Sequence, residues 1–531
     1  MQKIKIPYEL QKMNSLFEAA GYEAYLVGGA VRDEIMGKGA HDWDVATNAR
    51  PEEVMKIFRR VIPTGIKHGT VTVHFMKKAI EVTTFRTESD YSDGRHPDKV
   101  EYAGRIEEDL SRRDFTMNAM AASLKDGAIV DPYGGQGDIK ARVIRTVGVP
   151  HERFMEDGLR PVRAVRFASQ LGFNIEQNTY DDILNAETLA NVARISAERF
   201  RDEFCKMLLS PVPSVGLQLL EQSGLLKIFI PELLEGRGCV QSDERGFHDF
   251  DVLDHNFYAC DGALLRDPMS LTVRESGHVD NFLNKTTRSG ILSGLTRQSF
   301  NDRLLILRLA ALFHDVAKPR VKAVDGVSVS CSGLTRTSFA PDSAGGGQSL
   351  ACERAPHDGK ITFYNHDALG AKMAREILVR LKFSNAQIDA VCHLIKEHMF
   401  NYESSWTDAA VRRFVQRVGA ENIDSLFDLR LADIYGMHKV PVRLHDSAVC
   451  GKLLELQERV AQVLAQKSAM GLKDLAVSGN DLIALGIPAG KKLGAILKEL
   501  FEAVTDDPAM NSRDALLGLA KNLYSQKYSG Q

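Results

Sequence analysis

The sequence predicts an α+β protein, with a mixed N-terminal segment followed by a chain that is helical over most of its length. Two β-branched runs, Val71–Phe75 and Ile80–Phe85, carry the strand signal of the N-terminal segment. From Pro150 onward, apolar residues recur with helical spacing through residue 235, then over 302–322 and 365–524. The 531 residues are enough for roughly three or four domains of ordinary size.

Short strands and helices alternate in the N-terminal segment. Tyr25–Val27 is a short apolar run that ends in Gly28-Gly29, and a helical stretch begins at Ala30. Pro51–Arg60 has helical spacing with proline at its start, where the missing N–H is not needed. Since the two β-branched runs follow, residues 22–130 are predicted to form a sheet with helices.

Charge and composition exclude several classes of protein. The 67 Lys and Arg are balanced by 70 Asp and Glu, which excludes a strongly basic coat protein but not a local basic groove. Residues 1–15 have no signal-peptide core, and the apolar run Leu304–Phe313 is interrupted by Arg308 and too short to span a bilayer. The seven cysteines form no CxxC pair, so we expect a reduced, cytoplasmic location without a membrane.

Two segments interrupt the helical pattern. Asp267–Asn301 is polar and poorly periodic. Asp325–Gly359 contains six Ser and six Gly, three of them consecutive at 345–347. We expect a long loop or an insertion in each place.

A pair of carboxylates, Asp42 and Asp44, forms the first chemical signal. On a strand, residues two apart point to the same face, where two ionised carboxylates repel unless a divalent cation such as Mg²⁺ lies between them. Glu81, on a later strand-like run, would complete a two-metal site. The alternative is an ordinary solvated Asp-x-Asp turn.

A phosphate-binding pattern lies just upstream of this pair. Gly28-Gly29 separates an apolar run from a helical one, which lets backbone N–H groups approach a phosphate closely. Arg32 adds a fixed fork of donors for phosphate oxygens. The order strand, Gly-Gly, Arg, Asp-x-Asp indicates a site for a nucleotide and a metal.

Seven ordered blocks of sequence now point to a family. They are GGAVRD at 28–33, DWD at 42–44, EVTTFR at 81–86, DGRHP at 93–97, EEDLSRRDFTMNAMA at 107–121, DPYGG at 131–135 and EDGLRPVRAVRF at 156–167. Together they resemble the polymerase β-like nucleotidyltransferases, and more narrowly the bacterial tRNA nucleotidyltransferase and poly(A) polymerase family. The resemblance implies a polymerase β-like head with a mixed sheet.

The resemblance also implies roles for single residues. Asp42 and Asp44 would hold a catalytic Mg²⁺, with Glu81 as a third ligand or base; Glu81 could instead be a strand carboxylate paired with Arg86. Gly29 and Arg32 would contact the nucleotide. Arg113 would do so as well, ahead of a predicted helical run over Phe115–Ser123. The polar stretch Ser89–Pro97 is expected to be a loop near the site.

Four charged residues spaced by three follow at Asp157, Arg160, Arg163 and Arg166. On a helix they would lie along one side, and few acidic residues nearby balance them, so we expect an uncompensated basic stripe. By resemblance, Asp157 and Arg160 would read the incoming base, while Arg163 and Arg166 would hold phosphate or stabilise the helix. Pro161 suits only a first helical turn, which leaves the start of this helix open.

A second constellation lies in the helical part of the chain. His255, His314, Asp315 and Asp433, with further histidines at His366 and His398, occur in the order that resembles an HD phosphohydrolase domain. Histidine nitrogens and carboxylate oxygens can bind a divalent metal together. The resemblance permits phosphatase or cyclic phosphodiesterase activity on RNA ends, with Mg²⁺, Mn²⁺ or Ni²⁺.

These observations divide the chain into four parts. They are a nucleotidyltransferase head over 1–145, a helical neck with a base-reading helix over 146–235, an HD-like domain with insertions over 236–440, and a helical, tRNA-binding tail over 441–531. Between Lys140 and Arg166, seven Lys and Arg outnumber three Asp and Glu, which favours binding of an RNA backbone.

The leading hypothesis is template-independent addition or repair of the 3′-terminal CCA of tRNA from CTP and ATP with Mg²⁺. An enzyme that adds only A, or a poly(A) polymerase, remains an alternative within the family. Two others are an HD-type phosphohydrolase whose head only binds, and an RNA-binding module with a decayed active site. The sequence leaves the oligomeric state open.

Overall fold

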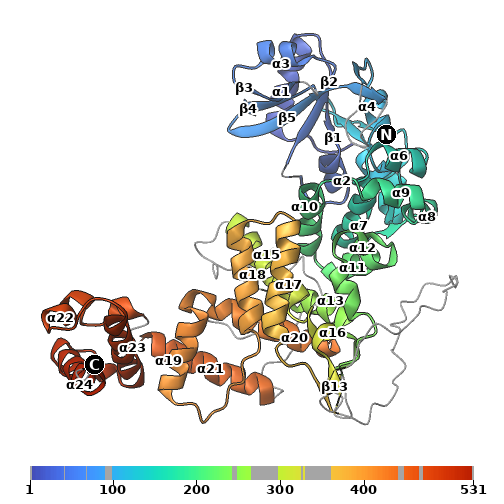
Figure 1. The fold of residues 1–531 in the computed structure, drawn as a ribbon. Coiled ribbons are helices and arrows are strands. Elements are labelled where there is room, and N and C mark those ends of the chain that lie inside the picture. Colours follow the sequence, from blue (N-terminus) through green and yellow to red (C-terminus); the bar gives the residue numbers. More distant parts are fainter. Residues whose placement is uncertain are drawn as a thin grey trace. The chain divides into compact units, whose positions relative to one another are not determined.

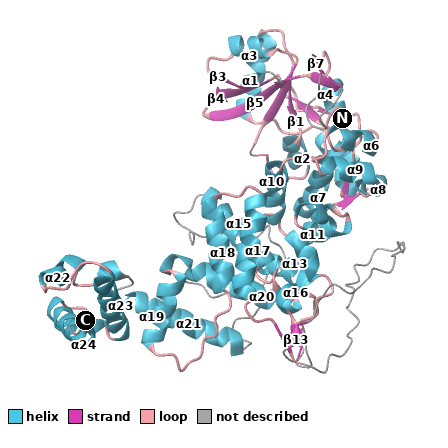
Figure 2. Cartoon of the chain, in the orientation of Figure 1, coloured by secondary structure: helices cyan, strands magenta, loops and turns pink. Residues whose placement is uncertain are grey.

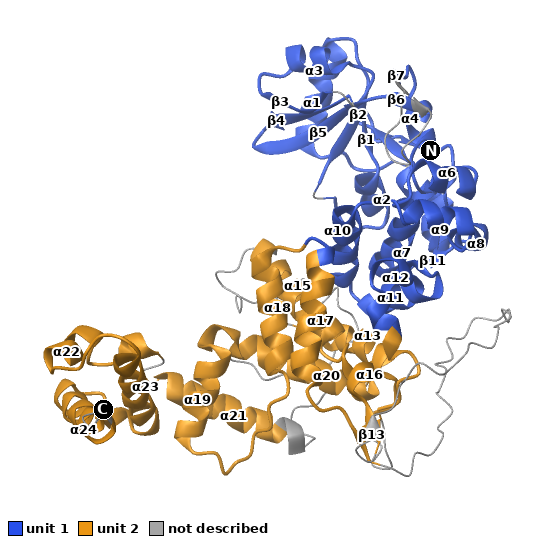
Figure 3. Ribbon diagram, viewed as in Figure 1, with its two compact units in different colours: residues 1–234, 380–382 blue, residues 235–379, 383–531 orange. Residues whose placement is uncertain are grey.

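The structure is a computed structural model that describes most of the chain. The described residues are 3–40, 42–66, 69–89, 99–241, 248–264, 297–324, 327–328, 360–439, 448–465 and 471–528. They form two compact units, coloured separately in Figure 3: residues 1–234 with 380–382, and residues 235–379 with 383–531. Figure 2 shows the strands gathered mainly in the first unit, so the predicted α+β class is confirmed.

The first unit contains a seven-stranded mixed sheet with strand order β3-β4-β5-β2-β1-β8-β9 (Figure 1). Its strands are β1 (Ala24–Val27), β2 (Asp44–Thr47), β3 (Val61–Gly65), β4 (Thr70–Phe75), β5 (Lys78–Thr84), β8 (Ala121–Ser123) and β9 (Ile129–Val130). Strands β2 and β5 run parallel, and the other neighbours are antiparallel. The strands predicted from the apolar and β-branched runs are confirmed.

The parallel pair determines how the carboxylates lie. Asp44 opens β2 and is the direct register partner of Glu81 on β5. Asp42 lies in a bend before β2, so the prediction that both aspartates share a strand is wrong. The reason is that β2 pairs with β1 and β5 only from Asp44 onward.

The predicted helix over Phe115–Ser123 is also wrong. Thr116–Asn118 form one 3₁₀ turn, η2, and the chain then enters β8, where Ala121 pairs with Val27 of β1. Residues 115–122 are all buried. A short apolar run that is buried on every side has no periodicity that would distinguish a helix from a strand.

Helices flank the sheet and continue the first unit beyond it. Those of the sheet region are α1 (Tyr8–Ala19), α2 (Gly29–Ile35), α3 (Pro51–Ile57), α4 (Ile106–Ser111) and α5 (Gly135–Ala141). Those that follow are α6 (Pro150–Glu156), α7 (Arg160–Leu171), α8 (Gln177–Ile183), α9 (Ala186–Val192), α10 (Ala197–Leu208), α11 (Pro213–Gln222) and α12 (Leu225–Phe229). Three short elements complete the unit: the ribbon β6 (Arg86–Ser89) with β7 (Lys99–Tyr102), the pair β10 (Val143–Ile144) with β11 (Asn174–Ile175), and the 3₁₀ helix η3 (Pro231–Gly236), which ends just inside the second unit.

The helix start that Pro161 left open is resolved. Helix α7 begins at Arg160, so Pro161 occupies its first turn, where proline is tolerated. Asp157 is not helical but forms the C-cap of α6, with extended backbone. The predicted single helix face is therefore a junction between two helices.

In the second unit, the described residues form helices and a small sheet of β12 (Ala323–Val324), β13 (Val327–Ser328) and β14 (Ile361–Thr362). Its first helices are α13 (Val252–Gly262), α15 (Arg297–Phe313), α16 (Lys318–Val321), α17 (His366–Arg380), α18 (Asn385–Glu397) and α20 (Ile423–His438). Gly436 lets α20 approach α13 closely, because a Cβ there would lie 2.8 Å from the carbonyl oxygen of His255. This close packing brings residues of α20 beside His255.

The remaining helices form the C-terminal part of the second unit. They are α19 (Asp408–Val418), α21 (Ala448–Ala465), α22 (Gly479–Ala484), α23 (Lys491–Asp506) and α24 (Arg513–Tyr528), with 3₁₀ turns η4 (Ala420–Asn422), η5 (Leu472–Asp474) and η6 (Pro508–Met510). Leu482, Ile496, Leu500 and Leu516 form the centre of its last core. The buried Arg412 ties α19 to α23 by donating to the carbonyl of Thr505 over 2.6 Å.

Several predictions fall outside the described residues. They are the block at 93–97, the loop after Ser89, and nearly all of the segments 267–301 and 325–359. Among the helices that are described, none is both long enough and apolar enough to cross a membrane.

Candidate functional sites

A cavity of about 650 Å³ in the first unit collects most of the predicted site residues. It is lined by Gly28, Gly29, Arg32, Asp42, Asp44, Arg112, Arg113, Asp114, Asn118, Asp157, Arg160, Arg163, Arg166, Phe167 and Lys206. Nine of the ten residues predicted for the nucleotide site are among them, and Glu81 is the exception. Seven cationic side chains against four carboxylates give the cavity the charge that a polyanion requires.

Glycine is required where the cavity wall begins. Gly28 has φ of 70°, and a Cβ on it would lie 2.8 Å from Nη1 of Arg113. A Cβ on Gly29 would lie 3.5 Å from Nη2 of Arg32. Gly28 therefore lets the guanidinium group of Arg113 lie directly against the backbone, whereas Gly29 leaves ordinary van der Waals space beside Arg32.

The carboxylates Asp42, Asp44 and Glu81 fit a hard divalent cation. Asp42 and Asp44 line the cavity, and Glu81 faces Asp44 across the parallel strands. Burial and the neighbouring Glu81 raise the pKa of Asp44, while Arg113 opposes the rise. Crowded carboxylates of this kind are the oxygen ligands that Mg²⁺ prefers.

Arg113 is held in place from α4. The buried Asp109 accepts from Nη2 of Arg113 over 3.3 Å and from Nε and Nη2 of Arg112 over 3.0 and 2.8 Å. Although burial would raise the pKa of Asp109, the two arginines lower it. A fully charged carboxylate thus fixes both arginines at the cavity wall.

Asp157 and Arg160 meet at the junction of α6 and α7. One oxygen of Asp157 accepts from the backbone N–H of Leu159, and the other accepts from Nη2 of Arg199 over 2.7 Å. Arg160 pairs with Glu156 and donates from Nη2 to the carbonyl of Arg112 over 2.9 Å. Both side chains are held rigidly and border the cavity.

Arg163 and Arg166 do not form the uncompensated stripe that the sequence predicted. Arg163 donates from Nε and Nη2 to Asp114, and Arg166 pairs with the buried Glu203 over 2.5 Å. The prediction was wrong because Asp114 precedes Arg163 by 49 residues and Glu203 comes from α10, so neither is near in sequence. The arginines form a partly buried ionic network.

Four residues at this site escaped the sequence reasoning. Asn118 accepts from Nη1 of Arg32, Phe167 lines the cavity, and Arg199 and Lys206 reach the site from α10. Arg199, Glu203 and Lys206 are spaced by four and three, which places them on one face of α10. This spacing was the signal in the sequence that could have identified these residues as part of one site.

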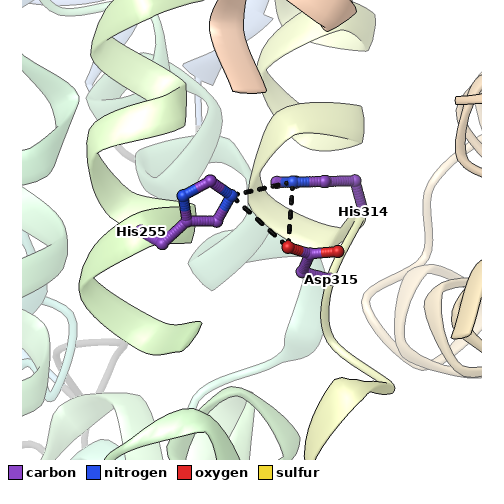
Figure 4. Close-up of side chains that lie close together, drawn as sticks. All are labelled: His255, His314 and Asp315. Carbon is purple, nitrogen blue, oxygen red and sulfur yellow. Dashed lines mark hydrogen bonds and ion pairs between the residues drawn. The ribbon is translucent and has the colours of Figure 1, made fainter. Parts of the chain in front are cut away.

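The second constellation is assembled in the second unit. Nε2 of His255 lies 3.1 Å from Nε2 of His314 and 3.4 Å from Oδ2 of Asp315 (Figure 4). Oδ1 of Asp433 lies 3.3 Å from Nε2 of His255 and 3.5 Å from Nε2 of His314. The four predicted residues are brought together from α13, the end of α15 and α20, and all are buried.

Three histidines of this cluster have their proton position fixed by the backbone. Nδ1 of His314, His366 and His398 lies 2.8, 2.6 and 2.5 Å from the carbonyl oxygen three residues earlier. Each Nδ1 therefore carries the proton that it donates to that carbonyl, and Nε2, the nitrogen that can bind a metal once it is deprotonated, faces the cluster. Nε2 of His366 and His398 face each other over 3.2 Å, an arrangement that suits a shared cation.

Asp315 connects two groups of potential ligands. One is His255, His314 and Asp315, and the other is Asp315, His366 and His398. His314 and Lys318 keep the pKa of Asp315 well below its usual value against the effect of burial. Burial likewise opposes the charge of His314, but Asp315 and Asp433 raise its pKa to about 10. The negative field that does this also favours a divalent cation.

Four family models match this chain. The Poly A polymerase head domain matches residues 24–145, and the probable RNA and SrmB-binding site of polymerase A matches 172–236. The HD domain matches residues 288–437, and the putative tRNA nucleotidyltransferase domain 2 matches 363–520. Together these models identify domains of the tRNA nucleotidyltransferase and poly(A) polymerase family over residues 24–145, 172–236 and 288–520. Its predicted family and HD domain are confirmed.

Curated relatives in this family carry the name CCA-adding enzyme. That of Lactiplantibacillus plantarum is 47% identical over 234 residues, which are 44% of this chain and 56% of the relative. That of Geobacillus kaustophilus is 51% identical over 213 residues, which are 40% of this chain and 52% of the relative. The chain therefore spans about half the length of the curated relatives that it matches.

Solved structures of the family share the fold. The CCA-adding enzyme of Bacillus stearothermophilus in complex with CTP matches with a TM-score of 0.60 and 25% identity, over 98% of both chains. The predicted polymerase β-like head and helical remainder are thereby confirmed.

Proposed function

We propose that this protein adds nucleotides to the 3′ end of tRNA without a template and completes the CCA sequence from CTP and ATP. The observation that carries the proposal is the single cavity in which Asp42 and Asp44 lie together with Arg32, Asp157 and Arg160. The cavity therefore combines carboxylates that could bind a metal, an arginine that could bind a polyphosphate, and an Asp–Arg pair that could bind a base. The relatives named CCA-adding enzyme, one of them solved with CTP, support this substrate.

Each group has a part in the proposed reaction. Arg32 and Arg113, held against Gly28-Gly29, bind the triphosphate and orient it for in-line attack by the tRNA 3′-hydroxyl. Asp42 and Asp44 would hold a Mg²⁺, with Glu81 as a further ligand or base, and the metal would lower the pKa of that hydroxyl and neutralise charge on the phosphates.

Base selection is assigned to Asp157 and Arg160. Cytosine and adenine each carry an exocyclic amino group, from which the carboxylate of Asp157 can accept. Uracil and guanine present a carbonyl oxygen in its place, so the Asp157 acceptor would face another acceptor. Arg199 holds the Asp157 carboxylate in one orientation, as this recognition requires.

The four predicted parts remain the proposed division of labour. Residues 1–145 carry the chemistry, 146–235 read the base, 236–440 contain the HD site, and 441–531 bind tRNA through its shape and phosphates. Among the described cysteines, Cys205, Cys260 and Cys392 form no disulfide, which supports the proposed reduced setting of the cytoplasm.

The test is nucleotide addition by the full chain with Mg²⁺. Transcripts of tRNA ending three, two or one nucleotide short of CCA are incubated with each NTP singly. CCA addition requires CTP on the first two substrates and ATP on the third. Incorporation of ATP alone on every substrate would instead establish an A-adding enzyme or a poly(A) polymerase.

We also propose a second activity, hydrolysis of phosphate esters at RNA ends by the HD site. It is supported by the convergence of Nε2 of His255 and His314 with carboxylate oxygens of Asp315 and Asp433. A bound Mg²⁺, Mn²⁺ or Ni²⁺ supplies a nucleophilic hydroxide at neutral pH.

Phosphate release from 2′- and 3′-nucleotides and from 2′,3′-cyclic nucleotides, assayed with each metal, tests this second activity. His314→Ala should remove the release and leave nucleotide addition unchanged. A wild-type protein that releases no phosphate with any of the three metals would exclude the activity.

A further inference from the structure

Three arginines of the nucleotide cavity converge on one aromatic ring. The guanidinium carbons of Arg166, Arg32 and Arg163 lie 3.6, 5.3 and 5.6 Å from the ring centroid of Phe167. Arg32 belongs to α2, whereas the other two arginines and Phe167 belong to α7. The ring therefore links a helix beside the sheet to the helix that follows the base-reading junction.

The charges around this ring are crowded. Each arginine has a carboxylate partner: Asp33 for Arg32, Asp114 for Arg163 and Glu203 for Arg166. Burial, with Arg163 as a like charge nearby, lowers the pKa of Arg166 to about 10 despite Glu203. Three guanidinium groups around one point would repel one another, and the face of an aromatic ring offsets part of that repulsion through its quadrupole.

Phe167 is placed to do this while it also packs in the core. It lines the cavity, is 5% exposed, and meets the buried Phe115 edge to face with centroids 5.8 Å apart. No other ring among the described residues has three cations over it. An aliphatic residue of similar size would fill the space but would provide no attraction for the arginines.

We propose that Phe167 is a positioning residue that holds Arg32, Arg163 and Arg166 together as a site for the polyphosphate of the incoming nucleotide. This inference rests on the proposed function, because it assumes that the cavity receives a nucleoside triphosphate. It goes beyond that function by assigning the alignment of the phosphate-binding arginines to a residue that itself has no polar atom.

The test separates anion binding from catalysis. The affinity of the full chain for inorganic tripolyphosphate with Mg²⁺ is measured by calorimetry for wild type, Phe167→Leu, Phe167→Tyr and Phe115→Leu. Since cation–π contacts contribute about 0.5–2 kcal/mol each, Phe167→Leu should weaken binding by about tenfold or more. Phe167→Tyr keeps the ring and should stay within about threefold of wild type.

Phe115→Leu is the matched control, because it makes the same change in the neighbouring buried ring, over which no described arginine lies. It should lower the melting temperature about as much as Phe167→Leu does but leave tripolyphosphate affinity unchanged. Equal losses of affinity in both leucine variants, or no loss in Phe167→Leu, would overturn the inference. So would a wild-type protein that does not bind tripolyphosphate.

The proposed function can fail independently of this inference. A wild-type protein that binds tripolyphosphate through the Phe167 cluster but adds no nucleotide to any tRNA would refute the proposed function alone. In that case the comparison of variants still decides the role of Phe167, because calorimetry does not depend on turnover.

Discussion

Asp44 and Glu81 are direct partners across the one parallel strand pair of the head sheet, 37 positions apart in the chain. Burial raises the pKa of Asp44 most, and the nearby carboxylate of Glu81 raises it further. Two ionised carboxylates on neighbouring strands repel one another, and a cation bound between them would remove that repulsion. This relationship makes the metal site testable residue by residue.

Glu81→Gln tests whether Glu81 belongs to the metal site. The change removes one negative charge but keeps the size of the side chain, so we expect nucleotide addition to fall by about 10- to 100-fold and half-saturation to require more Mg²⁺. A Mg²⁺ titration of the addition rate measures both effects. Glu52→Gln, on the exposed side of α3, is the control and should match wild type. Equal Mg²⁺ dependence in wild type and Glu81→Gln would remove Glu81 from the site.

Asp157→Ala tests base selection. Loss of the acceptor should lower the preference for CTP over UTP by about 10- to 100-fold, because a well-placed hydrogen-bond pair discriminates bases by about 1–3 kcal/mol. The ratio of kcat/KM values for the two nucleotides is the readout. Asp202→Ala, a mostly exposed aspartate on α10, should keep the wild-type ratio. If discrimination survives Asp157→Ala intact, another group reads the base.

Asp114 and Arg163 predict a specific acid sensitivity. Although burial would raise it, Arg163 lowers the pKa of Asp114 from 3.8 to about 2. The folded chain therefore keeps this carboxylate charged at pH values where the unfolded chain already protonates it. Its contribution to stability, about 2 kcal/mol, is complete above about pH 4 and is lost as the pH falls toward 2.

Asp114→Asn should remove this part of the pH dependence. The variant should be less stable by about 3 kcal/mol at neutral pH, because Arg163 loses its main partner, and the difference from wild type should shrink below pH 4. Urea unfolding at several pH values measures it. Asp126→Asn, in an exposed pair with Lys3, should leave stability nearly unchanged. A difference that stays constant with pH would contradict the assigned ion pair.

Asp315 belongs to both groups of potential metal ligands in the HD site. We therefore expect Asp315→Ala to lower the amount of bound metal more than the replacement of one histidine does. After loading with Ni²⁺ or Mn²⁺ and dialysis, metal analysis should show the largest loss for Asp315→Ala and a partial loss for His366→Ala. His393→Ala, on α18 outside the cluster, is the control. Metal content in Asp315→Ala equal to that of wild type would argue against a metal at this site.

The sequence predicted those features that depend on local order. The β-branched runs became β4 and β5, and Gly28-Gly29, Asp42, Asp44 and Arg32 met in one cavity as expected. The HD residues were also identified by their order, although they come from separate helices.

What escaped prediction depends on contacts distant in sequence. The basic stripe of α7 is neutralised by Asp114 and Glu203, which no local count of charges could include. The buried run 115–122 had no periodicity that would identify β8 as a strand, because it is enclosed on every side. Arg199 likewise lies 42 residues from Asp157 in the chain, so its bond to that carboxylate depends on how α10 packs.

The central claim is that one cavity builds CCA from CTP and ATP. The most direct measurement is sequencing of the products when the full chain, Mg²⁺ and all four NTPs act on a tRNA transcript that lacks its last three nucleotides. We predict that the transcript gains CCA and that addition then stops, and that Asp42→Asn and Asp44→Asn add nothing while still binding tRNA. A run of adenosines, or tails of mixed sequence, would contradict the account.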